Sequence, residues 1–267
     1  MATAYPPTRS EVAGGYGRGI GAIELDKLTW PEVEAELRGG RETVVVAFGA
    51  TEQHGHHMPL ATDALIGDHF ALRLADRLEA FVAPTVRVGC SSHHLAFPGT
   101  LSIADQTFHA IVADLVSSLE RAGFRPIVLV PTHGGNFAPL AGAVEKLPDS
   151  QRERVVAITD LSVFLRVAQL GEREFGVPMP EGGLHAGEWE TSMLLAIHPD
   201  LVHMDRAEAG YVGDPQEAIA SLFESGVESL SESGAIGDPT RASAEHGRRY
   251  WEAVLDLAVE LVEAESR

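Results

Sequence analysis

A segment of a dozen residues near the start of the chain collects five side chains that bind metal ions well. Glu52, His54, His56, His57 and Asp63 all fall within EQHGHHMPLATD. Carboxylates and imidazoles together are the usual ligands of zinc and manganese centres. The segment therefore predicts a metal site. The alternative is a polar surface loop in which the histidines are incidental.

Three later segments carry side chains of the same kinds and count against that alternative. Two are short turns rich in histidine or glycine, and the third combines a histidine with an acid five positions later. Their candidate residues are, in chain order, His93 and His94, then His133 with Gly134 and Gly135, and finally His185 with Glu190.

The elements that must position these clusters can be recognised from their patterns. Val44–Phe48 is wholly apolar and precedes the first cluster, and residues 126–131 form a second apolar run directly before His133. Such runs are typical of strands buried on both faces. Because the carboxyl ends of parallel strands lie on one edge of a sheet, we expect these clusters to face one crevice.

Strands and helices alternate along the rest of the chain, which predicts one α/β domain over residues 1–267 around a mainly parallel sheet. A helix should begin after Thr29, whose N-cap position is supported by Glu32 three residues later. Residues 1–22 should form an extended segment. Two further strands are expected, over 81–88 and 154–158, and Pro84 indicates an edge or a bulge in the first of them. The other expected helices are 64–78, 106–122, one from about 138, 162–169, 190–197, 216–224 and 242–264.

The composition argues against several classes of function. A formal net charge of −19 disfavours nucleic acid or an anionic membrane surface as a partner. No apolar run reaches membrane-spanning length, and the first residues lack the apolar core of a signal peptide. Cys90 is the single cysteine, so neither an internal disulfide nor a cysteine-based zinc site can form. We expect a cytoplasmic protein that acts on a small molecule, with the Cys90 thiol packed at the end of a strand.

In their order and spacing, EQHGHHMPLATD, HHLAFPGTLS, THGGN and HAGEWETSMLLAIHPDLV resemble the creatininase family of metal-dependent amidohydrolases. The resemblance extends from TWPEVEAEL to GDPTRASAEHG and so spans nearly the whole chain. It implies a three-layer α/β/α sandwich, a centre with two divalent metal ions and a homohexamer. Zinc is the favoured metal, with manganese and iron(II) as alternatives, because oxygen and nitrogen ligands suit all of them.

The resemblance also implies roles for individual residues. Glu52, His54, Asp63 and His133 match metal ligands of the family, and Asp63 would bridge the two ions. His185 matches the histidine that protonates the leaving nitrogen, a step that amide cleavage requires because amide nitrogen leaves poorly without a proton. His93, His94, Gly134 and Gly135 are candidates for contact with the substrate, although the two histidines could equally pack the loop.

One departure from the family concerns the second ion. Creatinine-cleaving members have a tyrosine and then a ligand glutamate where this chain has Gly134 and Gly135, and Glu181 stands where a tryptophan would enclose creatinine. Glu190 is therefore the expected replacement ligand. This assigns Glu52, Asp63 and His133 to one ion, and His54, Asp63 and Glu190 to the other.

The alternative for Glu190 is that it only hydrogen-bonds a histidine. Two neighbouring side chains are expected to have no part in the site: Glu188 should be solvated, and His246 should lie on the surface of the last helix.

The predicted function is hydrolysis of a C–N bond in a small cyclic amide or a formamide. Creatinine itself, a formamide cleaved by a deformylase, and a short peptide end as in mycofactocin maturation are alternatives within the family. A metal-binding protein without catalysis is an alternative of another class. His185 argues against it, because a storage or sensing site needs no acid.

Overall fold

The computed structural model describes residues 21–160 and 162–265, and within them five strands form one parallel sheet in the order β1-β3-β2-β4-β5. The two central strands pair along five residues each, from Val44 opposite Ile127 to Phe48 opposite Pro131. The strands are β1 Ile23–Glu24, β2 Val44–Phe48, β3 Phe81–Val82, β4 Ile127–Pro131 and β5 Val155–Ala157.

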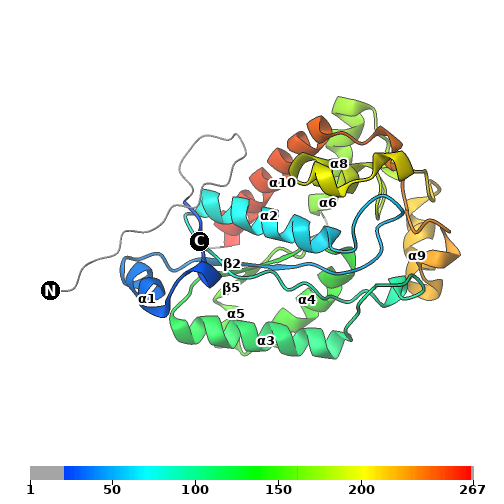
Figure 1. Cartoon of the computed structure of the whole chain (residues 1–267). Helices are drawn as coiled ribbons and strands as arrows, with labels where there is room; N and C mark the ends of the chain where they lie inside the picture. Colours follow the sequence, from blue (N-terminus) through cyan, green and yellow to red (C-terminus); the bar gives the residue numbers. More distant parts are fainter. Residues whose placement is uncertain (1–20, 161, 266–267) are drawn as a thin grey trace.

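Helices cover both faces of this sheet, and α2 and α3 lie on opposite sides of it (Figure 1). Successive side chains of a strand point to opposite faces. Val45 and Ala47 accordingly pack in the core with α2, α8 and α10, whereas Val46 and Phe48 pack in the core with α3 and α4. The predicted three-layer α/β/α sandwich is confirmed.

The predicted helices are present, with bounds that agree to within a few residues. The helices are α1 Trp30–Arg38, α2 Thr62–Leu78, α3 Asp105–Ala122, α4 Phe137–Glu145, α5 Asp149–Arg152, α6 Ser162–Leu170, α7 Met179–Gly182, α8 Glu188–Ile197, α9 Pro215–Ser225 and α10 Ala244–Glu265. The two short helices α5 and α7 were not predicted. The predicted capping box of α1 is present, with the Thr29 N–H donating to the Glu32 carboxylate at 2.7 Å. No helix in the part of the chain described here has both the length and the apolarity that crossing a membrane requires.

One prediction for the strand beside β2 needs correction. The strand expected over 81–88 ends at Val82, because Pro84 has no N–H to donate to a neighbouring strand. The chain still follows β2 beyond this break, through a bridge between Phe48 and Val86. Most of the predicted extended segment, residues 1–20, lies outside the described residues, and Ile23–Glu24 forms an edge strand that was not expected.

A single side chain ties together the strand ends that support the predicted site. Asn136 is the only asparagine of the chain, and it is fully buried just after β4. Its Oδ1 accepts a hydrogen bond from the Cys90 N–H, and its Nδ2 donates to the carbonyls of Phe48 and Gly49, each at 3.0 Å. A Cβ atom at Gly89 would lie 2.5 Å from Oδ1, so this close approach requires glycine there.

Replacing Asn136 with alanine should therefore weaken the fold at the base of the site. We expect the free energy of unfolding to fall by roughly 1–3 kcal/mol for the buried groups left without partners. Denaturant titration of the metal-free protein measures this loss. Gln151→Ala, which removes one half-exposed amide contact to Glu120, is the control and should change stability much less. Equal stabilities of the two variants would contradict the role assigned to Asn136.

Candidate metal centre

Buried carboxylates without hydrogen-bond donors form the middle of the predicted site. Glu52 follows β2, and Asp63 lies in the first turn of α2; their side chains are 0% and 2% exposed. Both carboxylate oxygens of Glu52 and Oδ2 of Asp63 are buried and accept no hydrogen bond. A buried carboxylate is stable only when it is paired or bound to a cation. These residues therefore fit a metal centre.

Close contact between β2 and α2 brings the two acids together. A Cβ atom at Gly49 would lie 2.8 Å from the backbone of Ala64 and from the carbonyl oxygen of Asp63, so only glycine lets the helix start this near the strand end. The Thr132 hydroxyl, just beyond β4, donates to the same Asp63 carbonyl at 2.8 Å. The start of α2 is thus fixed against both central strands.

Two histidines direct a ring nitrogen toward these acids. The Nε2–H of His133 donates to the Cys90 carbonyl at 3.2 Å, and the Nδ1–H of His54 donates to the Glu52 backbone carbonyl at 3.0 Å. Ligand histidines in metal sites are oriented by such a bond from the other ring nitrogen. His133 Nδ1 and His54 Nε2 consequently face the carboxylates, and these are the atoms that carry the lone pair when the rings are neutral.

The Asp63 carboxylate lies between the two histidines. Its Oδ1 is 3.4 Å from His54 Nε2, and its Oδ2 is 3.4 Å from His133 Nδ1. Each oxygen thus faces a different imidazole, which is the arrangement that a bridging carboxylate needs. His133 Nδ1 is also 3.2 Å from Glu52 Oε1.

The pKa values follow from this concentration of negative charge. Burial by itself lowers the pKa of His54, but the carboxylates of Glu190 and Asp63 raise it well above its ordinary value. Burial also opposes the charge on His133, whose pKa is raised well above normal by Glu52 and Asp63. Burial raises the pKa of Asp63, but the nearby His54 and His133 rings lower it below the usual range. The carboxylates thus attract positive charge strongly, as a cation site requires.

Glu190 reaches the centre from α8 through a tightly packed turn. Its Oε1 is 3.5 Å from His54 Nε2, and its Oε2 accepts the N–H of Ala186 at 2.7 Å. A Cβ atom at Gly187 would lie 2.3 Å from the Gly182 carbonyl, so glycine is needed for this approach. Ala186 has the unusual φ of 52° and is fully buried, which shows how firmly the surrounding packing holds the turn.

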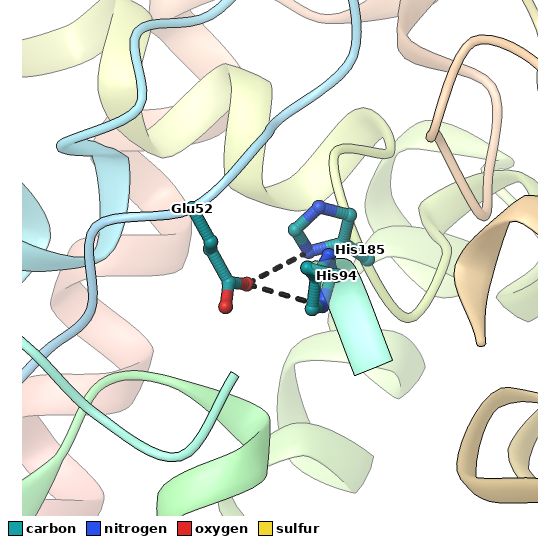
Figure 2. A group of neighbouring side chains, drawn as sticks. All are labelled: Glu52, His94 and His185. Atoms are coloured by element: carbon teal, nitrogen blue, oxygen red, sulfur yellow. Dashed lines mark ion pairs between the residues drawn. The ribbon is translucent and has the colours of Figure 1, made fainter. Parts of the chain in front are cut away.

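His185 lies beside the same acids. Its Nε2–H donates to the Gln53 backbone carbonyl at 2.7 Å, so its Nδ1 is unprotonated and lies 3.6 Å from Glu52 Oε1 (Figure 2). Burial and then the nearby His54 lower the pKa of His185, which favours the neutral ring. The ring is therefore placed to accept a proton at Nδ1.

Among the described residues, the ligand atoms form three groups with all separations within 4.8 Å. The first, Glu52 with Asp63 and His133, is the set predicted for one ion. The second combines His54 and Glu190, both predicted for the other ion, with His185; Asp63 approaches this group only through its 3.4 Å contact with His54. The third group is Glu52, His94 and His185.

The residues expected to contact substrate border this centre. His94 is buried, with its Nε2 3.3 Å from Glu52 Oε1, and His93 stacks on His133 with ring centroids 5.8 Å apart. Gly134 is exposed, and a Cβ atom there would meet nothing within 4 Å. At Gly135 a Cβ atom would lie 2.4 Å from both the Cys90 carbonyl oxygen and His133 Nε2, so the family's glutamate has no room at this position.

Two expectations about neighbouring residues are wrong. Glu188 is fully buried, not solvated: its carboxylate accepts hydrogen bonds from Ser192 and Tyr250, each at 2.8 Å, and lies 2.7 Å from His246 Nδ1. His246 is therefore not a free surface residue. The reason is that α8 and α10 pack against each other, which the sequence of neither helix reveals.

The sequence analysis did not select two residues that lie close to the candidate site. Gln53 lies between the candidate ligands Glu52 and His54 in the sequence, and its side chain contacts His94 and His185. Phe223 of α9 is 66% exposed and lies over His93, with ring centroids 5.2 Å apart. The polarity of EQHG indicated Gln53 only weakly, and no local signal pointed to Phe223. Cys90, by contrast, is a packed thiol as predicted, and burial and then Asp105 raise its pKa to about 12.

Comparison with known proteins agrees with this geometry. A family profile described as "Creatininase: Creatinine amidohydrolase" matches residues 26–262. The chain belongs to the creatininase family. It is 33% identical to the mycofactocin precursor peptide peptidase of Mycobacterium ulcerans (strain Agy99), over 86% of this chain and 84% of that protein. It is 34% identical to the creatinine amidohydrolase of Pseudomonas putida, over 69% and 75%.

Solved structures of this family share the fold. A tryptophan-to-phenylalanine mutant of creatininase superimposes with a TM-score of 0.76 at 28% identity, over 91% of this chain and 98% of the other. Related creatininase structures include one named as a Zn-Zn type and one named with Mn. As the family predicts, the chain is a hydrolase that acts on C–N bonds.

Replacing Asp63 tests whether one carboxylate serves two ions. Asp63→Ala should remove most of the bound metal as well as activity, because a binuclear centre would lose a shared ligand. Metal per chain, measured by elemental analysis after dialysis, is the readout. Asp68→Ala, on the same helix but paired with Arg87 at the surface, should keep both. Retention of about two ions by Asp63→Ala would rule out the bridge.

Glu190→Gln separates ligation from simple hydrogen bonding. The amide can still accept from the Ala186 N–H, but the negative charge beside His54 is lost. We expect about one metal ion per chain instead of about two, with hydrolysis largely lost. Glu260→Gln, at an exposed position of α10, provides the matched control. Two tightly held ions in Glu190→Gln would send the search for the missing ligand to His185, which lies in the same group of ligand atoms as His54.

Proposed function

We propose that this protein hydrolyses the C–N bond of a small amide at a centre that holds two divalent metal ions. The observation that carries the proposal is the set of buried carboxylate oxygens without hydrogen-bond donors, which are faced by Nε2 of His54 and Nδ1 of His133. Glu52, Asp63 and His133 would hold one ion, and His54, Asp63 and Glu190 the other. Zinc is the first choice, with manganese and iron(II) as alternatives. Two such cations, when bound, lower the pKa of water and polarise a carbonyl group.

The surrounding side chains supply the proton transfers. His185 is held by the Gln53 carbonyl with Nδ1 directed at the centre, so it takes a proton there from the attacking water and passes it to the leaving nitrogen. The neutral ring favoured by burial suits the first of these steps. A protein that only stores metal would have no use for such a proton carrier.

A small cyclic amide or a formamide is the substrate we propose first. The blocked Cβ position at Gly135 disfavours creatinine itself, because the ligand glutamate of creatinine-cleaving members cannot stand there. A short peptide end is the second candidate. It is favoured by the four relatives named mycofactocin precursor peptide peptidase, which are 32–35% identical to this chain.

One experiment tests the proposed function and ranks these substrates. Protein purified without chelators should contain about two ions per chain and should hydrolyse at least one member of a panel of cyclic amides, formamides and short peptides. Removal of the metal should abolish the reaction, and adding zinc or manganese should restore it. Activity that survives complete removal of metal would overturn the proposal. Light scattering of the same sample tests the homohexamer that we also propose from the family resemblance.

Replacing His185 with alanine tests its role in proton transfer. The variant should keep its metal but lose roughly 10²–10⁴-fold in turnover, the usual range for a positioned acid or base. The loss should shrink for amides with better leaving groups, which need less protonation. His203→Ala, at an exposed position, is the control. An equal loss across the leaving-group series would show that His185 binds substrate or metal instead.

A further inference from the structure

The Gln53 side chain lies between His94 and His185, and a backbone hydrogen bond fixes the orientation of its amide group. It is 5% exposed, and its Oε1 accepts the N–H of Gly55 at 3.0 Å. Its amide nitrogen therefore faces the opposite way, toward the carbonyl oxygen of Gly234 and the two imidazoles.

Three polar atoms lie within hydrogen-bonding distance of this nitrogen, which has two hydrogens to donate. Gly234 O, at 3.0 Å, can only accept, so it takes one of them. His185 Nε2 is also 3.0 Å away, but it already donates its own hydrogen to the Gln53 backbone carbonyl and cannot accept. The second hydrogen must therefore go to His94 Nδ1, at 2.9 Å.

This bond determines the tautomer of His94. A neutral imidazole carries one hydrogen, so an accepting Nδ1 leaves the hydrogen on Nε2. His94 Nε2 and His185 Nδ1 are the atoms that face Glu52, at 3.3 and 3.6 Å from its Oε1 (Figure 2). One histidine thus presents an N–H to the centre, and the other presents a lone pair.

We propose that Gln53 is a positioning residue that sets opposite tautomers in His94 and His185. The proposal rests on the amide hydrolysis proposed above. In that reaction water adds to the carbonyl carbon, its proton goes to His185 Nδ1, and the C–N bond breaks as that proton moves to the leaving nitrogen. His94 transfers no proton. Its Nε2–H donates a hydrogen bond to the substrate carbonyl oxygen as negative charge develops there.

The same assignment limits which residues can bind metal. Glu52, His94 and His185 lie close enough to form a third cation site, but a protonated Nε2 cannot donate a lone pair. His94 is then a hydrogen-bond donor to the substrate and not a ligand. The centre is left with the two ions proposed above.

Nitrogen NMR of the zinc-loaded protein, labelled with ¹⁵N in its histidine rings, tests the tautomers directly. The His94 signals are identified by their loss in His94→Gln. We expect the hydrogen of His94 on Nε2, and a hydrogen on Nδ1 would overturn the proposal. This readout needs no substrate, so it stands even if the protein fails to hydrolyse every amide in the panel.

Gln53→Glu tests the consequence for catalysis. A carboxylate has no hydrogen to give to His94 Nδ1, so the ring should invert its tautomer and lose its inward N–H. Loss of one such donor should lower kcat by about 10²–10³-fold, with little change in KM or metal content. Gln106→Glu adds the same charge at an exposed position in the first turn of α3 and should change none of these quantities. Wild-type kcat in Gln53→Glu would overturn the proposal.

A second pair of variants keeps the proposal testable if Gln53→Glu fails to fold. Glutamine at position 94 still offers an N–H, whereas leucine offers none. We expect His94→Gln to retain at least about tenfold more of the wild-type kcat than His94→Leu, at equal metal content. Equal rates for the two would show that His94 contributes only packing.

Discussion

Uncompensated negative charge in a buried space is the constraint on which this structure depends. Glu52 and Asp63 lie at the carboxyl edge of the sheet with oxygens that accept no hydrogen bond, and Glu190 approaches the same space from α8. Repulsion between carboxylates in a medium of low polarity costs several kcal/mol unless a cation relieves it. Burying them so close together is stable only with positive charge between them. Folding of this edge and metal binding are therefore linked.

The backbone, more than the side chains, holds this arrangement in place. The His54, His133 and His185 rings each donate to a main-chain carbonyl, so their orientation follows directly from the path of the chain. The Asn136 side chain joins the carboxyl end of β2 to the segment at Cys90 through hydrogen bonds. Gly49 and Gly89 lie where a Cβ atom would collide with a neighbour. Side-chain positions set in this way vary little, as a metal centre requires.

One wall of the candidate site consists of aromatic rings, unlike the carboxylates and histidines at its centre. Gly135 leaves no room for a side chain, because a Cβ atom there would lie 3.0 Å from the His93 ring, which stacks on His133. Phe223 then extends this row of rings outward to the surface. The centre is thus made of side chains held by the backbone, whereas this wall is made of rings from separate segments. Relatives of similar identity to this chain have names that refer to different substrates, a mycofactocin precursor peptide and creatinine.

The sequence by itself determined the elements and the types of ligand. Apolar runs such as Val44–Phe48 and helical periodicity are local signals, and parallel strands bring their carboxyl ends to one edge, so clusters far apart in sequence could be placed together. Only the tertiary structure decided which groups are buried and which ring nitrogens are protonated. Glu188 was expected to be solvated, but the packing of α8 on α10 buries it. Gln53 is important only because it contacts His94 and His185, which are 41 and 132 residues away in the sequence. Burial and tautomer depend on partners distant in sequence, and no local pattern contains them.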